Sequence, residues 1–116
     1  MAVLITDRSD LMDAEQREFA ERRLSFALSR FDSRIVDVEL VVWDDNGPRG
    51  GVDQACRLHI KLRGGEPIVI TDRDSELGRA IARLAERGAR SVARAVDRLR
   101  EHRRPDASSG AAVPTG

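Results

Sequence analysis

Residues 35–43, with the sequence IVDVELVVW, alternate apolar and acidic side chains over most of their length. An alternation with period two is typical of a strand that is buried on one face only. The apolar residues predicted to share the buried face are Val36, Val38, Leu40 and Val42. Asp37 and Glu39 are then expected to point the other way, so this strand belongs to a sheet that is covered on one side.

The following segment predicts that the strand continues into an antiparallel hairpin. Residues 44–51, with the sequence DDNGPRGG, are dense in turn-forming residues. Beyond them, apolar Cys56, Leu58, Ile60 and Leu62 alternate with basic Arg57, His59, Lys61 and Arg63. Two shorter apolar runs, 3–6 and 68–71, predict two further strands and therefore a four-stranded sheet.

One helix is predicted between the first and second strands, and another after the fourth strand. Residues 13–30 place apolar side chains three or four positions apart, and Asp13 is the expected N-cap. A longer helix is expected from about residue 75 to 103, ending before Pro105. Its apolar seam consists of Leu77, Ile81, Leu84, Val92, Ala95, Val96 and Leu99. Gly88 lies in this seam and indicates either close packing on the sheet or a bend.

The element order is therefore β-α-β-β-β-α, which predicts an α+β fold with two helices on one face of a four-stranded sheet. We expect one domain over residues 1–104 and a disordered tail over residues 105–116, where Ala, Ser, Gly and Pro dominate. No apolar run approaches the ~20 residues that cross a bilayer, so we expect no membrane association and a cytoplasmic location. The single cysteine, Cys56, has no second thiol for a disulfide.

Charge is distributed unevenly along a chain whose formal net charge is zero. Residues 1–53 hold 7 arginines against 12 acidic residues, whereas residues 54–104 hold 13 basic residues against 7 acidic ones. A basic face on a neutral protein can bind an anionic polymer locally. The alternative is that these charges only solvate exposed helix faces.

The arginines of the second predicted helix recur every three or four residues, at Arg79, Arg83, Arg87, Arg90, Arg94 and Arg98. At about 100 degrees per residue these six, here called the arginine stripe, fall within an arc of roughly 100 degrees and span about 28 Å. Guanidinium groups suit phosphates, because they are permanently charged planar forks of donors. Glu86 and Asp97 are expected to pair with a few of them. We interpret the stripe as an RNA-binding surface; an acidic protein partner is the alternative.

A second candidate surface lies on the first helix, where Arg22, Arg23 and Arg30 accompany two phenylalanines. Phe19 and Phe26 are interpreted as the flank of the core rather than as stacking platforms, because phenylalanine is usually buried. Lys61, on the outward side of the third strand, is a further candidate contact, although that side could equally be the wet face of the sheet.

Enzyme signatures are not found in this sequence. Cys56 and His59 are three residues apart on one strand, so they are expected on opposite faces and cannot act as nucleophile and base. The turn at residues 44–47 lacks the ligand spacing of a calcium loop. We therefore predict a protein without catalytic activity, metal, cofactor or small-molecule substrate.

Several segments together resemble the ribosome hibernation-promoting factor family, also called RaiA or sigma-54 modulation proteins. Residues 5–8 (ITDR) are similar to the family's I-T-G-R start, and residues 17–25 (REFAERRLS) are similar to its R-E-Y-V-E-E-K-L-S helix. The similarity continues through Phe31-Asp32, residues 35–40 (IVDVEL), and residues 72–77 (DRDSEL) with the following Ala80-Ile81. It covers roughly residues 3 to 100.

This resemblance implies the same fold, which resembles double-stranded-RNA-binding domains, and a partner in the rRNA of the small ribosomal subunit. Binding in the channel for messenger and transfer RNA would inhibit translation. Arg23 and Arg87 stand where the family tends to have lysine, and Arg90 matches an arginine. The departures from the family pattern are Asp7 for glycine, Phe26 for a basic residue, Gly78 for an aromatic and Gly88 for an aliphatic residue. The second domain through which long members pair ribosomes is missing, so pairing by that route is not expected, and the oligomeric state stays open.

Overall fold

The computed structural model describes residues 1–46 and 52–103. Its elements are β1 (Ala2–Asp7), α1 (Ala14–Leu28), the 3-10 helix η1 (Ser29–Arg34), β2 (Ile35–Asn46), β3 (Val52–Leu62), β4 (Ile68–Asp74) and α2 (Leu77–Arg103). The tail predicted at residues 105–116 and most of the predicted turn, residues 47–51, lie outside the described residues. Within the described part, no helix is long and apolar enough to cross a membrane.

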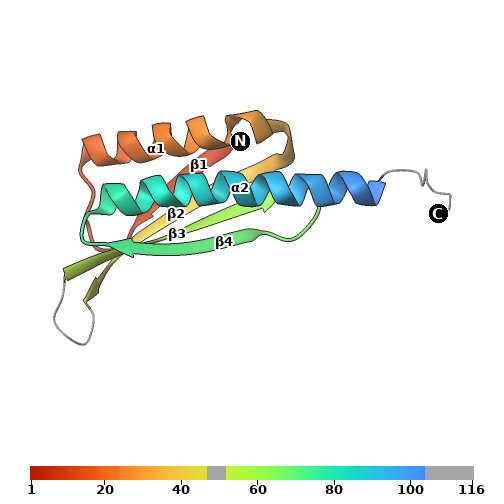
Figure 1. Ribbon diagram of the computed structural model, residues 1–116. Coiled ribbons are helices and arrows are strands. Elements are labelled where there is room, and N and C mark those ends of the chain that lie inside the picture. Colours follow the sequence, from red (N-terminus) through yellow and green to blue (C-terminus); the bar gives the residue numbers. More distant parts are fainter. Residues whose placement is uncertain (47–51, 104–116) are drawn as a thin grey trace.

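The four strands form one mixed sheet in the order β1-β2-β3-β4. β1 runs parallel to β2, whereas β2 pairs antiparallel with β3, and β3 with β4. Parallel neighbours need a long crossover connection, and α1 provides it. Figure 1 shows α1 and α2 side by side on the same face of the sheet. The predicted element order and α+β architecture are confirmed.

The core lies between this covered face and the two helices. Strand pairing brings Val38 opposite Ile60 and Leu40 opposite Leu58, and these four side chains are almost completely buried. The helices contribute the buried residues Ala20, Leu24, Leu28, Ile81, Leu84 and Val92. Each element therefore buries its periodic apolar positions against the others, as the spacing in the sequence predicts.

The start of β2 differs from the prediction. The register shifts between Ile35, which pairs with Leu62, and Asp37, which pairs with Lys61, so Val36 is an extra residue in the ladder. An inserted residue of this kind is a β-bulge and changes the phase of the strand. As a result Ile35 is fully buried and Val36 is exposed, so the prediction that Val36 faces the core was wrong.

The connection from β1 to α1 is organised by two carboxylates. Asp13 caps α1: its side chain accepts from the Gln16 backbone N–H at 2.8 Å while Gln16 Oε1 accepts from the Asp13 N–H at 3.1 Å, which confirms the predicted N-cap. Asp7 accepts from the backbone N–H of Leu11 at 3.0 Å and of Met12 at 2.8 Å. Burial alone would raise the pKa of Asp7, but these donors outweigh it and hold the pKa below its usual value. This carboxylate therefore stabilises the turn where the related family has glycine.

At Gly88, α2 packs closely against the sheet. A Cβ atom at this position would lie 2.8 Å from Leu58 Cδ2 and 3.4 Å from Ile60 Cδ1, both in the buried core. At Gly78, near the start of the same helix, the nearest atom would be Phe19 Cε2 at 3.9 Å, an ordinary contact. Of the two explanations for Gly88 that the sequence allows, close packing is the one realised.

We expect Gly78→Ala and Gly88→Ala to change stability in opposite directions. Alanine is favoured over glycine in a helix by up to about 1 kcal/mol, so Gly78→Ala should raise the free energy of unfolding. At Gly88 the same gain is outweighed by overpacking, which typically costs about 1–3 kcal/mol in a filled core. Urea unfolding curves of the two variants would measure this. Equal stabilisation by both substitutions would show that α2 does not lie this close to Leu58.

Candidate nucleic-acid interface

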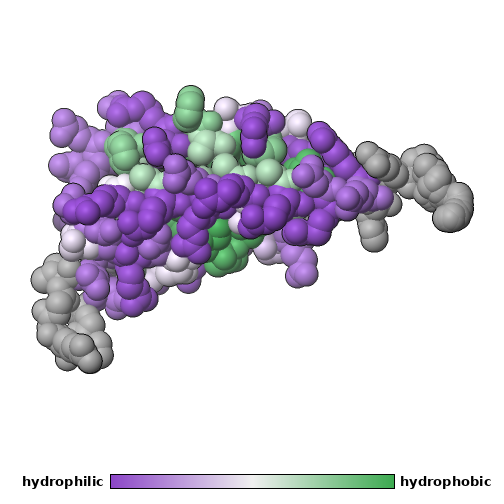
Figure 2. Space-filling view, viewed as in Figure 1, coloured by the Kyte–Doolittle hydropathy of each residue, from purple (hydrophilic) through white to green (hydrophobic). Residues whose placement is uncertain are grey.

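The arginine stripe lies on the exposed side of α2, and its first half borders β4. Leu84, Gly88 and Val92 of this helix are buried below it, whereas the arginines are exposed or half-buried. Figure 2 shows a continuous hydrophilic band along α2 in the same view as Figure 1. The six arginines therefore share one face as predicted, but their surroundings change along the helix.

Arg83 is held by two aspartates at the end of β4. Its Nε donates to Asp72 Oδ2 at 2.9 Å and its Nη2 to Asp72 Oδ1 at 3.2 Å, a two-point contact with one carboxylate. Its Nη1 donates to Asp74 Oδ2 at 3.0 Å, and Nη2 also donates to the Arg73 carbonyl at 3.0 Å. Every nitrogen of this guanidinium has a partner, so Arg83 fastens α2 to β4.

Two neighbours of Arg83 are attached to the same acidic segment. Arg79 donates to Glu76, and Arg87 donates to the Thr71 carbonyl at 3.3 Å, with Nη1 3.6 Å from Asp72 Oδ2. In the described residues neither Glu86 nor Asp97 forms a salt bridge with the stripe. The expected pairing with Glu86 and Asp97 was therefore wrong: Arg83 pairs instead with two aspartates at the end of β4, and Arg90 and Arg94 form no salt bridge among the described residues.

These contacts change the proton affinity of the groups involved. Hydrogen bonds from Arg83 are the main reason why the pKa of Asp72 is below its usual value, and the Arg73 backbone N–H acts in the same direction while burial opposes them. The pKa of Arg83 is raised by the same two aspartates. Asp72 is 16% exposed, so its pairing with Arg83 is only partly screened by solvent. The N-terminal part of the stripe is thus largely neutralised within the protein.

The C-terminal part of the stripe has different surroundings. Among the described residues no carboxylate oxygen lies within 4.0 Å of Arg90, Arg94 or Arg98. Arg94 makes one long hydrogen bond, from Nη2 to Ser91 Oγ at 3.4 Å. The positive charge of this part is therefore not balanced by a close carboxylate and is open to an anionic partner.

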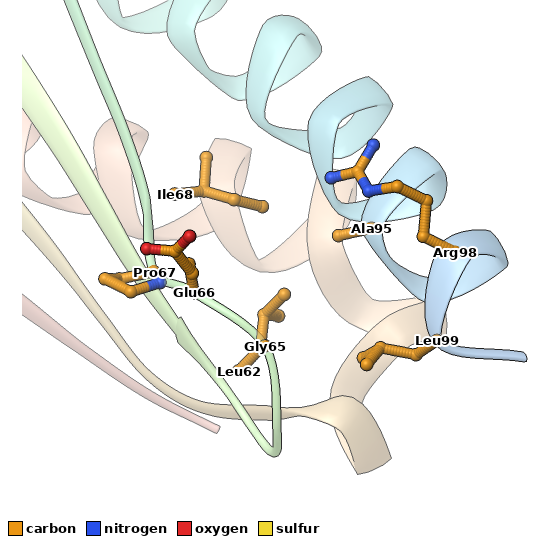
Figure 3. A pocket seen from close by; sticks show the side chains of 8 residues that line it. All are labelled: Leu62, Gly65, Glu66, Pro67, Ile68, Ala95, Arg98 and Leu99. Atoms are coloured by element: carbon orange, nitrogen blue, oxygen red, sulfur yellow. The ribbon is translucent and has the colours of Figure 1, made fainter. Parts of the chain in front are cut away.

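Arg98 lies at the edge of a hollow of about 350 Å³ beside the C-terminal part of α2. Figure 3 shows the residues that line it: Leu62, Gly65, Glu66, Pro67, Ile68, Ala95, Arg98 and Leu99. Arg98 reaches it from α2 and Glu66 from the β3–β4 connection, on the opposite side (Figure 3). The last arginine of the stripe is therefore turned toward the edge of the sheet rather than toward α1.

On α1, the surroundings of the two phenylalanines differ. Phe19 packs against the core as interpreted, but Phe26 is 83% exposed, so its assignment to the core flank was wrong. The ring shares its helix face with Arg22 and Arg23, which precede it by four and three residues, whereas Arg30 lies beyond the end of α1, in η1. Arg22 pairs with Glu18 at 2.9 Å, an exposed pair that contributes little to stability. The guanidinium of Arg30 lies 4.7 Å from the centre of the Phe31 ring, a cation–π contact.

A shallow groove lies between α1 and α2, and we call it the inter-helix groove. It encloses about 270 Å³ and is lined by Arg23, Phe26, Ala27, Ala85, Glu86, Ala89 and Arg90. In Figure 2 the strip between the two helices is apolar, in agreement with the alanines of this lining. Arg23 and Arg90 come from different helices, so sequence periodicity alone could not show that they share one groove.

Lys61 is separated from this surface by the sheet. It follows buried Ile60, precedes buried Leu62, and pairs in register with Asp37, so its side chain is on the face that the helices do not cover. Arg57 is on the same open face, where its guanidinium lies 5.9 Å from the centre of the Trp43 ring. Lys61 therefore cannot contact a flat partner together with the stripe.

The chemistry of a catalytic or metal site is not assembled in the described residues. Cys56 is completely buried, and burial raises the pKa of its thiol to about 12, so it is a poor nucleophile near neutral pH. His59 is on the opposite face of β3, as predicted. No group of three or more His, Cys, Asp or Glu in this part of the chain could hold a metal ion.

Solved structures with the same architecture are known. A ribosomal subunit interface protein from Coxiella burnetii superimposes with a TM-score of 0.69 at 13% sequence identity, over 84% of this chain and 99% of that one. The N-terminal domain of Protein Y from Thermus thermophilus gives a TM-score of 0.62 at 21% identity, over 79% of this chain and 93% of that one. No protein-family model matches the chain, and no curated protein matches it in sequence.

These similarities define the class of fold: a four-stranded mixed sheet with two helices on one face, as in ribosomal subunit interface proteins. The chain therefore shares its fold with a ribosomal subunit interface protein and with the N-terminal domain of Protein Y, and the fold that the sequence resemblance implied is confirmed.

We expect Asp72→Asn and Arg83→Gln each to destabilise the protein, because a part-buried, charge-assisted contact loses one partner. The pKa of Asp72 is lower in the folded chain, so its stabilisation is present above the unfolded pKa of about 3.9 and is lost as pH falls through the folded value. Urea unfolding as a function of pH should show a shallower acid dependence for Asp72→Asn than for wild type.

Asp37→Asn is a matched control, because Asp37 is exposed on the open face of the sheet. If Asp37→Asn and Asp72→Asn changed the acid dependence equally, the fastening of α2 to β4 by Asp72 would be refuted.

Proposed function

We propose that this chain is a non-enzymatic, ribosome-associated factor of the hibernation-promoting type. It binds rRNA of the small ribosomal subunit in the channel that messenger and transfer RNA occupy, and it inhibits translation by occupying that channel. The proposal is carried by one observation, a band of arginines along α2 on a fold shared with a ribosomal subunit interface protein. Such a factor acts in the cytoplasm, where ribosomes are, and needs no cofactor.

The arrangement of charge supports an RNA partner. Each phosphate contact made by an arginine releases counterions, so a row of unpaired guanidinium groups is the usual means of binding a polyanion. A neutral chain can do this only if cations are gathered on one surface, as the six arginines of the stripe are along α2. Inhibition by occupancy requires affinity and position rather than chemistry, which suits a surface without nucleophile or metal ligands.

Within this surface we assign different roles to the arginines. Arg90 and Arg94, which have no carboxylate close by among the described residues, contact phosphates directly. Arg23, on the α1 side of the inter-helix groove, and Arg22 beside it add further contacts. Arg83 is a positioning residue, because its donors are already used by Asp72 and Asp74. Arg79, Arg87, Arg98 and Arg30 are at the margins of the same face and add to its potential.

We predict that the protein co-sediments with small subunits or whole ribosomes at low salt and is released at high salt. Arg90→Gln with Arg94→Gln should weaken this binding and reduce the slope of log affinity against log salt by up to about 0.9 per lost phosphate contact. Stability should change little, because both side chains are exposed and glutamine is nearly as good a helix former as arginine. Sucrose-gradient sedimentation at several salt concentrations measures both effects.

The matched control is Arg57→Gln with Lys61→Gln, which removes the same charge from the open face of the sheet and should leave binding nearly unchanged. Wild-type protein that migrates freely at every salt concentration would refute ribosome binding. Association that persists after ribosomes are removed, with an acidic protein in the same fractions, would favour the alternative of a protein-interaction module.

A further inference from the structure

Phe26 is the most exposed large apolar side chain in the described residues, at 83%, in the last turn of α1. Burying a phenylalanine ring contributes about 1.5–3 kcal/mol, so a ring that the fold leaves in water is a surface available to a partner. Arg22 and Arg23, which precede it by four and three residues on the same helix, are both basic. A purely apolar partner would have to desolvate these guanidinium groups, so the partner must carry negative charge as well as an apolar face.

Two hollows meet at this ring. One, of about 240 Å³, is lined by Phe19, Arg22, Arg23 and Phe26. The other is the inter-helix groove of about 270 Å³, which Phe26 and Arg23 also line. Both are smaller than the roughly 300–1,000 Å³ of pockets for drug-sized ligands, so each has room for one small flat group rather than a whole metabolite.

The inter-helix groove combines an apolar floor with a cationic edge. Ala27, Ala85 and Ala89 are small, and Arg23 and Arg90 reach the groove from different helices. Glu86 is the one acidic residue of this lining, so phosphates have to contact the two arginines away from it. A nucleobase with its phosphates has the matching chemistry, since the base can stack on the ring and the phosphates can accept from the arginines. In a duplex both faces of a base are already stacked, so the base must be unpaired.

We propose that Phe26 is a stacking platform for one unpaired base of RNA, with Arg23 and Arg90 contacting the phosphates next to it. This inference rests on the proposed function and deepens it, because it specifies that single-stranded rather than fully paired RNA is recognised at the inter-helix groove. Base–aromatic stacking tolerates any base, so the platform selects for an accessible base and not for a sequence.

The test compares binding of a short single-stranded RNA oligonucleotide, labelled with 2-aminopurine at one position, with binding of a blunt duplex of the same length. Wild type should bind the single strand more tightly and change its 2-aminopurine fluorescence. Phe26→Ala should weaken single-strand binding by about 5- to 150-fold, the equivalent of 1–3 kcal/mol of stacking, and leave the salt slope unchanged, because no phosphate contact is lost. Phe26→Trp should bind at least as tightly as wild type.

Leu4→Ala is the matched control, because Leu4 is 61% exposed on β1, away from the inter-helix groove, and should leave binding unchanged. Urea unfolding of each variant checks that exposed substitutions leave the fold intact, as they usually do. Phe26→Leu separates stacking from general apolar contact: we expect it to bind like Phe26→Ala.

Three outcomes would overturn the stacking platform: equal binding of single strand and duplex by wild type, unchanged affinity in Phe26→Ala, or full affinity in Phe26→Leu, which would indicate a protein or other apolar partner. The proposed function is judged separately by wild-type sedimentation with ribosomes. If wild type sediments with ribosomes and Phe26→Ala binds the single strand normally, the stacking proposal fails and the proposed function stands.

Discussion

The close approach of α2 to β3 at Gly88 is the constraint on which the other features of the surface depend. With only a hydrogen atom at this position, the helix rests directly on Leu58 and Ile60. Because α2 lies this close to the sheet, Arg83 is within hydrogen-bonding distance of Asp72 and Asp74. For the same reason, Ala85 and Ala89 lie next to α1 and form part of the inter-helix groove. A single missing side chain in the core thus determines where the charged groups of the surface can reach.

The overall neutrality of the chain conceals a division within α2. The carboxylates at the end of β4 neutralise the arginines near the start of the helix, and no carboxylate among the described residues lies close to Arg90 or Arg94 further along. Among the described residues, the stripe arginines without a close carboxylate are therefore Arg90, Arg94 and Arg98, and Arg90 is the one that lines the inter-helix groove. The acidic residues that cancel the net charge also give part of the surface its rigidity, because Asp72 and Asp74 hold Arg83 in one geometry.

Local periodicity was sufficient to predict the element order, the buried face of β3 and the shared face of the six arginines, because each depends on spacing within one segment. The bulge at Val36 was not predictable, since a one-residue insertion changes the phase of a strand without changing its composition. The exposure of Phe26 and the pairing of Arg83 with Asp72 depend on which segments meet in space, and Asp72 is 11 residues away from Arg83. Glu86 is nearer than Asp72 to Arg83 along the chain, but Asp72 is the acid that contacts Arg83 in the fold.

The parallel pairing of β1 with β2 also has a kinetic consequence. Ala2 pairs with Asp37, so this contact closes a loop of about 35 residues, whereas β2, β3 and β4 are joined by short hairpin connections. We expect β2–β4 and α2 to form first and the β1–α1 segment to close last. The opening that allows hydrogen exchange of the β1 amides should therefore have a lower free energy than the opening that exposes the β3 amides. The inter-helix groove lies across the boundary between these two cooperative units. Any ligand that spans it would slow the opening of the less stable unit.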